Sequence, residues 1–186
     1  MSRGRLCWVG LVALSAAMAG FFLNRSITTQ PDGAQVERTS AMGGSLSIGR
    51  PRPAFTLTDL DNKPRDVSEW DGRVLVINFW ATWCPPCRNE IPVFIELQKQ
   101  YGQQGLQFVG IALDELQEVR EYAASVGINY PLLVGEQDAI DVARAYGNLF
   151  GALPYTAIID RAGRIAFTRQ GELSRAEAEE AIRTFL

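Results

Sequence analysis

Two cysteines separated by two prolines, Cys84 and Cys87, are the residues whose types and spacing are best suited to chemistry in this chain. They lie in the segment NFWATWCPPCRNEIP, residues 78–92, directly after an apolar run. A cysteine pair at this spacing can bind a metal, form a structural disulfide or work as a redox-active dithiol. Because each chemistry requires different surroundings, the neighbouring sequence discriminates between them.

The surroundings of the cysteine pair argue against a metal site and against a purely structural disulfide. A structural zinc site takes four Cys or His ligands, usually from two pairs, whereas this chain has no histidine and only one further cysteine, Cys7. A disulfide that closes so short a loop removes little entropy from the unfolded chain. The sequence therefore predicts no metal and no cofactor, and assigns the redox chemistry to the Cys84–Cys87 disulfide itself.

The place of Cys84 between two predicted elements supports the redox reading. RVLVINFW, residues 73–80, is typical of a strand buried on both faces, and residues 84–102 follow as a helix pattern. At a helix start, the free amides and the positive end of the helix dipole lower the pKa of a thiol and favour its attack on disulfides. Pro85 suits the first helical position, and Cys87, one turn later, can resolve a mixed disulfide formed by Cys84.

The segments that must position this dithiol alternate between strand and helix patterns. A hairpin is expected over residues 54–67, a second buried strand over 106–113, a short extended segment over 128–135 and a closing hairpin over 155–171. Together with the helices between them, this order predicts an α/β domain over residues 51–186. It has three layers, α/β/α, with a central mixed sheet and an N-terminal β-hairpin.

Helix boundaries in the second half of the chain are indicated by capping residues. Asp114 is expected to cap the helix in ELQEVREYAASVG, with Gln117 completing a capping box. A helix over residues 139–146 is expected to stop at Gly147. A second capping box, formed by Ser174 and Glu177, is expected to open the last helix.

The first 25 residues are predicted to be a membrane anchor. Two arginines precede an uncharged run from Leu6 to Leu23, which is close to the lower limit for spanning a bilayer. Residues 17–19, AMA, could form a signal-peptidase site, but the apolar run continues beyond them. We favour an uncleaved anchor over a cleaved signal that would leave a soluble periplasmic protein. The arginines keep the N-terminus cytoplasmic, so the domain is expected on the extracytoplasmic side of the cell membrane.

The remaining sequence features bear on partners other than the membrane. Residues 26–50 are rich in Ser, Thr, Gln, Gly and Pro and are predicted to form a flexible tether. The formal net charge is -3, and no run of five or more Lys and Arg occurs. Nucleic acid is therefore not an expected partner.

Two motifs give the chain a specific resemblance. FWATWCPPCRNEIP, together with GALPYTAIID at residues 151–160, resembles the membrane-anchored thioredoxin-like proteins of the ResA/TlpA family over essentially all of residues 51–186. The resemblance implies a thioredoxin-like fold and a thiol-disulfide oxidoreductase. It further implies that Cys84 is the exposed nucleophile and Cys87 the buried resolving thiol. Pro154 would be a cis-proline beside the dithiol, and Leu153 would offer backbone hydrogen bonds to a bound polypeptide.

Two further positions separate the chain from ordinary thioredoxins. Asn78 occupies the strand position at which thioredoxins carry a buried aspartate, and an asparagine cannot shuttle a proton. Glu90 matches the active-site glutamate of the ResA group. Three residues after Cys87, it lies about 60° around the helix from that cysteine. This spacing suits a proton acceptor for Cys87, whereas most helix glutamates are simply solvated.

The residues between the cysteines predict the direction of electron flow. Pro85 and Pro86 remove two backbone N–H groups from the first helical turn, and Arg88 is the nearest cation. We therefore expect only a modest lowering of the Cys84 pKa and a relatively reducing couple. The resemblance implies a membrane thiol-transfer protein of the DsbD/CcdA type as electron donor. It also implies substrates such as the disulfides of apocytochrome c or the copper-site cysteines of oxidase assembly factors.

Two other functions remain as alternatives to a protein-disulfide reductase. A peroxiredoxin-like peroxidase would share the fold and the AFTL-type beginning, but that family has Thr or Ser three residues before its peroxidatic cysteine, where this chain has Ala81. A metallochaperone of thioredoxin fold would need His or Met ligands beside the cysteines, and the sequence places neither there.

Overall fold

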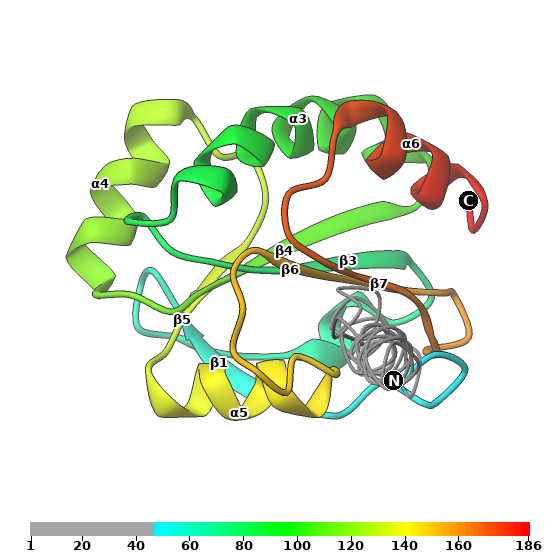
Figure 1. The fold of residues 1–186 in the computed structure, drawn as a ribbon, viewed down its shortest axis with the longest axis horizontal. Helices are drawn as coiled ribbons and strands as arrows, with labels where there is room; N and C mark the ends of the chain where they lie inside the picture. Colours follow the sequence, from blue (N-terminus) through cyan, green and yellow to red (C-terminus); the bar gives the residue numbers. More distant parts are fainter. Residues whose placement is uncertain (1–46) are drawn as a thin grey trace, which may run out of the picture. The chain divides into compact units, whose positions relative to one another are not determined.

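The computed structural model describes residues 47–186, which are drawn in colour in Figure 1. The predicted anchor and residues 26–46 of the predicted tether lie outside the described residues. Within residues 47–186, no helix is both long and apolar enough to cross a membrane. The last residues of the predicted tether are hydrogen-bonded to the domain, because Gly49 N donates to Ile165 O and Ile165 N donates to Arg50 O.

The described residues form one mixed sheet with the strand order β2-β1-β5-β4-β3-β6-β7. The strands are β1 (Thr56–Asp59), β2 (Pro64–Asp66), β3 (Val74–Trp80), β4 (Leu106–Ala112), β5 (Leu132–Val134), β6 (Tyr155–Ile159) and β7 (Ile165–Gln170). β3 is an inner strand of this sheet, since it pairs parallel with β4 and antiparallel with β6. The N-terminal hairpin β1–β2 and the closing hairpin β6–β7 are both antiparallel, as predicted.

Helices cover both faces of the sheet, which confirms the predicted three-layer arrangement (Figure 1). The helices α3, α4 and α6 lie on one face and α5 lies on the other. Their bounds are α3 (Pro85–Tyr101), α4 (Leu116–Val126), α5 (Gln137–Ala145) and α6 (Arg175–Arg183), with short 3-10 helices η1 (Val67–Trp70) and η2 (Gly102–Gln104). A short turn, residues 81–84, joins the end of β3 to the start of α3.

The side chains of β3 alternate between two buried clusters, because successive residues of a strand point to opposite faces. The cluster on the α3 side contains Val74, Val76 and Trp80. The cluster on the α5 side contains Leu75, Ile77 and Phe79. By this alternation Asn78, the only polar residue of the strand, points toward α3, and it is 1% exposed.

The start of α4 differs from the prediction. Its N-cap residue is Glu115, without a side-chain capping bond, so the predicted capping box of Asp114 and Gln117 is wrong. The carboxylate of Asp114 instead accepts hydrogen bonds from the Thr82 backbone N at 2.8 Å and the Thr82 hydroxyl at 2.5 Å. The carboxylate of Asp114 therefore binds Thr82, in the turn before Cys84, instead of capping α4.

Candidate active site

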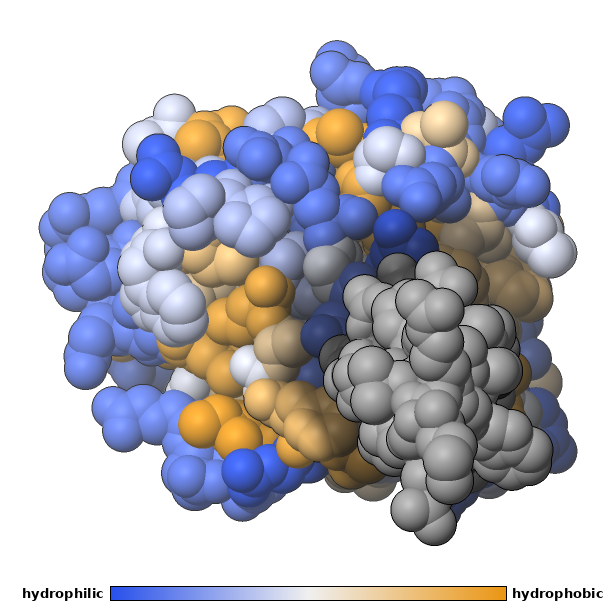
Figure 2. Space-filling model, viewed as in Figure 1, coloured by the Kyte–Doolittle hydropathy of each residue, from blue (hydrophilic) through white to orange (hydrophobic). Residues whose placement is uncertain are grey.

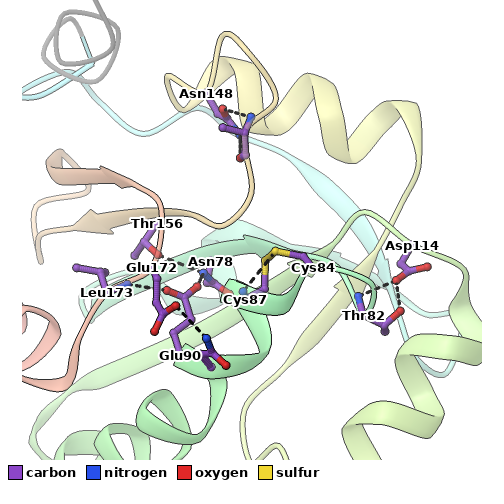
Figure 3. Close-up of a disulfide and its surroundings, with 12 residues drawn as sticks. Asn78, Thr82, Cys84, Cys87, Glu90, Asp114, Asn148, Thr156, Glu172 and Leu173 are labelled. Atoms are coloured by element: carbon purple, nitrogen blue, oxygen red, sulfur yellow. Dashed lines mark hydrogen bonds between the residues drawn. A yellow bond between two sulfur atoms is a disulfide. The ribbon is translucent and has the colours of Figure 1, made fainter. Parts of the chain in front are cut away.

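The two cysteines lie at the N-terminal end of α3, where they are joined by a disulfide with an S–S distance of 2.11 Å (Figure 3). Cys84 is the N-cap residue of the helix, and Pro85 occupies the first helical position, as predicted. The backbone N–H of Cys87 donates to Cys84 Sγ over 3.3 Å. One free amide of the first turn is therefore already directed at the sulfur that would carry the thiolate charge.

The exposure of the two sulfurs corrects one expectation. Cys84 is 4% exposed and Cys87 is fully buried, so the prediction of an exposed Cys84 is wrong for this disulfide form. Both cysteines belong to the buried cluster on the α3 side. The exposed group at the site is instead the neighbouring indole of Trp83, which is 67% exposed, whereas Trp80 is packed in the core. A partner that approaches Cys84 therefore meets Trp83.

The first turn of α3 offers little other stabilisation to a Cys84 thiolate. Pro85 and Pro86 have no backbone N–H to donate. The guanidinium of Arg88 lies 5.5 Å from the ring centre of Tyr122 on α4, in a cation–π arrangement. The cation that is nearest in the sequence is thus engaged with an aromatic ring of another helix.

Glu90 lies one helical turn after Cys87 and is buried, with 1% exposure. Both carboxylate oxygens accept hydrogen bonds in the site (Figure 3). Oε1 accepts from Asn78 Nδ2 at 2.7 Å, and Oε2 accepts from the backbone N of Leu173, just before α6, at 3.0 Å. The carboxyl group is therefore held by a strand on one side and by the β7–α6 segment on the other.

Burial raises the pKa of Glu90 from its usual value of 4.5 to about 7. The N–H donors of Leu173 and Asn78 oppose this rise, and the negative charge of Glu172 adds to it. Glu172 itself accepts a hydrogen bond from Asn89 Nδ2 over 3.1 Å. A carboxyl with a pKa near neutrality can take up and release a proton at physiological pH, as a general base must.

Asn78 has a role that the sequence did not reveal. Its Nδ2 donates to Glu90 Oε1 and, over 3.2 Å, to the hydroxyl of Thr156 on β6. Its Oδ1 is buried and has no hydrogen-bond partner within the described residues. Asparagine at this position thus binds the carboxyl group of α3 instead of supplying one of its own. The signal in the sequence was a single polar residue on the α3 side of an apolar strand.

Pro154 lies at the beginning of β6, and the peptide bond between Leu153 and Pro154 is cis, as the resemblance implies. β6 pairs with β3 so that Tyr155 lies opposite Phe79. Pro154 therefore lies beside the C-terminal end of β3. The turn that carries Cys84 follows from that end. The carbonyl of Pro154 accepts a hydrogen bond from Gly171 N.

The loop before Pro154 is closed by Asn148, which is 3% exposed. Its side chain donates to the Ala152 carbonyl at 2.8 Å and accepts from the Ala152 N–H at 2.9 Å. Between these two residues, Leu149 and Phe150 are 54% and 70% exposed. The loop therefore presents two apolar side chains to solvent on a closed turn.

The chemical groups that the site brings together are the disulfide and one carboxyl group with a raised pKa. Within residues 47–186, no three Cys, Asp or Glu side chains lie close enough together to hold a metal ion. The predicted residues Cys84, Cys87 and Glu90 all lie at the start of α3, and Pro154 lies at the neighbouring strand edge. This arrangement suits thiol-disulfide exchange with one group that accepts a proton.

Comparisons with known proteins agree with this chemistry. A family model described as Redoxin matches residues 48–182. The thiol-disulfide oxidoreductase ResA of Geobacillus kaustophilus is 32% identical over 136 residues, which cover 73% of this chain and 76% of that protein. ResA of Geobacillus thermodenitrificans is 30% identical over 137 residues, with coverage of 73% and 76%.

A solved structure extends the agreement to the fold. The crystal structure of a thiol:disulfide interchange protein, a thioredoxin family protein from Chlorobium tepidum TLS, superposes with a TM-score of 0.67 at 32% identity. The match covers 73% of this chain and 94% of that chain. The expected thioredoxin-like fold is thereby confirmed. The chain belongs to the redoxin family, and its disulfide, fold and relatives together make it a thiol-disulfide oxidoreductase of the ResA type.

Proposed function

We propose that the chain reduces disulfides of exported proteins through Cys84 and Cys87, from an N-terminal anchor that holds the domain on the extracytoplasmic side of the membrane. The observation that carries this proposal is the disulfide at the start of α3, one turn from a buried carboxyl group whose pKa lies near neutrality. The membrane part rests on the sequence of residues 1–25 alone.

The reaction begins with the reduced dithiol. The Cys84 thiolate attacks one sulfur of the substrate disulfide, whose S–S bond breaks while the departing sulfur takes up a proton. Cys84 is then joined to the substrate in a mixed disulfide. The exposed indole of Trp83 and the backbone of Leu153 are the groups that we assign to binding the substrate chain in this step.

The second step releases the substrate and requires Cys87 to lose its proton. Glu90 accepts that proton, and the Cys87 thiolate attacks the Cys84 sulfur. The bond between Cys84 and the substrate breaks, the Cys84–Cys87 bond forms, and the second substrate sulfur leaves as a thiolate that is then protonated. In sum, two electrons pass from the dithiol to the substrate disulfide. Asn78 is a positioning residue, since it holds Glu90 by the hydrogen bond to Oε1.

The proposed direction of electron flow follows from the first turn of α3. A strong oxidant needs a strongly stabilised thiolate. In the described residues, the one hydrogen bond to Cys84 Sγ comes from Cys87 N, and Arg88 is engaged with Tyr122. This limited stabilisation supports a relatively reducing couple. A reductant in an oxidising compartment must be recharged, and we assign that step to a membrane thiol-transfer protein of the DsbD/CcdA type.

The substrates that we propose are protein disulfides such as those of apocytochrome c or of copper-site cysteines, so that the chain would serve cytochrome c maturation or copper-site assembly. Trapping tests this assignment. In a Cys7→Ser background, Cys87→Ala should stall the reaction as a mixed disulfide of Cys84, and the captured protein names the substrate. The matched variant Cys84→Ala, which keeps Cys87, should capture nothing.

Two outcomes of the trapping experiment would contradict the proposal. Capture by Cys84→Ala instead of Cys87→Ala would reverse the roles of the two cysteines. Peroxide consumption by the reduced protein, without capture of any polypeptide, would favour the peroxidase alternative. Metal content of the reduced protein tests the metallochaperone alternative.

A further inference from the structure

A groove lies beside the exposed indole of Trp83, and we call it the Trp83 groove. Its cavity has a volume of about 280 Å³. Its apolar lining consists of Trp83, Leu113 and Ile140, and its acidic lining consists of Asp114, Glu115 and Glu136. The groove therefore combines apolar contact surface with three carboxyl groups, next to the turn that carries Cys84.

The groove is attached to the disulfide turn by two connections. Trp83 is bonded directly to Cys84, and Asp114 accepts the two hydrogen bonds from Thr82. In Figure 3, Thr82 and Asp114 lie on one side of the disulfide and Glu90 lies on the other. The groove therefore lies on the side of the Cys84–Cys87 disulfide that is opposite Glu90.

Apolar residues are exposed on the surface near the site. In Figure 2, apolar surface runs between the α3 layer and α5, and hydrophilic residues border it. Among the described residues, three of the five exposed large apolar side chains, Trp83, Leu149 and Phe150, belong to segments next to the site, since the last two precede Pro154. The other two are Ile48 and Val126. Exposed apolar residues gathered beside a reactive group are typical of a surface that binds another protein.

The three carboxyl groups of the groove have no cationic partner among the described residues. Asp114 accepts only neutral donors, from Thr82 and from the backbone of Glu115. The side chains of Glu115 and Glu136 form no salt bridge within residues 47–186. Within residues 47–186, no salt bridge therefore offsets their negative charge, and a cationic group that enters the groove would complement it.

We propose that the Trp83 groove binds a segment of the substrate polypeptide that carries Lys or Arg within a few residues of the cysteine attacked by Cys84. This inference rests on the proposed function, because it concerns which protein disulfides react fastest. An extended chain advances about 3.3 Å per residue. The residues next to the attacked cysteine thus pass Trp83, where their aliphatic stems contact the apolar lining and their charged ends reach the carboxylates.

The selectivity can be measured with three disulfides and the reduced full chain. Two synthetic peptides share one Cys-Gly-Gly-Cys disulfide, flanked on both sides by Lys in the first and by Glu in the second. The third compound is the neutral 2-hydroxyethyl disulfide, which has no segment to enter the groove. At low salt we expect kcat/KM to be about five- to tenfold higher for the Lys peptide than for the Glu peptide, given the modest strength of exposed charge pairs.

Two double variants identify the source of the preference. E115Q/E136Q, which leaves Asp114 as the remaining carboxylate of the groove, should reduce the preference for the Lys peptide to about twofold. E96Q/E180Q removes the same amount of negative charge from α3 and α6 and should keep the preference. About 0.5 M salt, which shortens the screening length to a few ångströms, should reduce the preference of the unaltered chain. The rate with 2-hydroxyethyl disulfide should be the same in all three proteins.

The possible results separate the inference from the function on which it rests. Equal rates for the two peptides in the unaltered chain would overturn the inference, as would a preference that is undiminished in E115Q/E136Q. Selectivity that fades as the protein concentration rises would mean that a second copy of the chain occupies the groove, which also overturns it. If all three disulfides fail to react, the proposed function fails as well.

Discussion

Glu90 is the residue whose environment differs most from that of an ordinary glutamate on a helix. Its pKa in the folded chain is about 7, against a usual value of 4.5. Between these two pH values, the folded chain keeps a proton that the unfolded chain has released. The free energy of unfolding therefore falls as the pH rises through this window, by about 3 kcal/mol in total.

Glu90→Gln removes this titration. The difference in unfolding free energy between E90Q and the unaltered oxidised chain should shift in favour of E90Q by about 3 kcal/mol from pH 4 to pH 8. Urea unfolding across that range measures it, with Glu180→Gln as a control that removes an exposed carboxyl group from α6. A difference for E90Q that does not vary with pH would show that Glu90 does not titrate in this window.

The same variant should resolve mixed disulfides roughly 100-fold more slowly, since it lacks the proton acceptor.

Asn78 should set the pH at which Glu90 works. In Asn78→Leu the carboxylate keeps only the N–H of Leu173 as a donor, so its ionised form is less stable and its pKa rises further. The pH midpoint for resolving a mixed disulfide should move up by about one unit, as expected for one hydrogen bond to a charged group. Thr156→Val removes only the other partner of Asn78 and should leave the midpoint in place. Equal shifts in the two variants would argue for a general effect on packing.

These residues also show the limit of prediction from sequence. Glu90 was found because its spacing from Cys87 along one helix and the family resemblance pointed to the same residue. The contact between Asn78 and Glu90 joins a strand to a helix, and the spacing of two residues along the chain does not show how separate elements pack. The low exposure of Cys84 was missed for the same reason, because the cluster that buries it on the α3 side of the sheet forms only in the folded chain.

At the level of elements, we expect the first turn of α3 to set the redox couple. Pro86→Ala should add a second N–H donor near Cys84 Sγ, beside that of Cys87. A better-stabilised thiolate has a lower pKa and makes the protein more oxidising. We expect the reduction potential to rise by roughly 30 mV, which corresponds to about 1.4 kcal/mol for a two-electron couple. Equilibration with glutathione measures the potential.

A second proline of the same helix provides the control for this prediction. Pro92 lies inside α3 and is exposed, so Pro92→Ala changes the helix without adding a donor at the cysteines. Its potential should stay close to that of the unaltered chain. If both variants change the potential equally, the stability of the helix and not the donor at Cys84 sets the redox couple.

Most elements could be predicted because each has a local cause. The apolar run of β3, the glycine that ends α4 and the capping box of Ser174 and Glu177 depend on neighbouring residues, and all three are confirmed. The predicted cap at Asp114 is wrong because its carboxylate has a tertiary alternative in Thr82. Local signals predict an element well when no distant group competes for the same side chain.

For the whole molecule, the anchor over residues 1–25 remains a prediction that cell fractionation can test. The full chain should stay in the membrane fraction after an alkaline wash, because an apolar helix of this length holds it in the bilayer. Protease added to spheroplasts should digest the domain, which marks it as extracytoplasmic. Deletion of residues 1–25 should remove both properties. A soluble periplasmic form that lacks its N-terminal residues would instead establish a cleaved signal.

The alternation of side chains along β3 places the redox chemistry on one face of the sheet and leaves the other face to stabilise the fold. The cluster on the α3 side contains both cysteines, and Glu90 and Asn78 lie on that side, whereas the cluster on the α5 side contains no cysteine. Substitutions that adjust the redox couple can therefore accumulate on one side of the sheet while the other side preserves the fold. We therefore expect relatives of this chain to differ in reduction potential and in proton transfer through residues on the α3 side, while the packing of α5 and its cluster is retained.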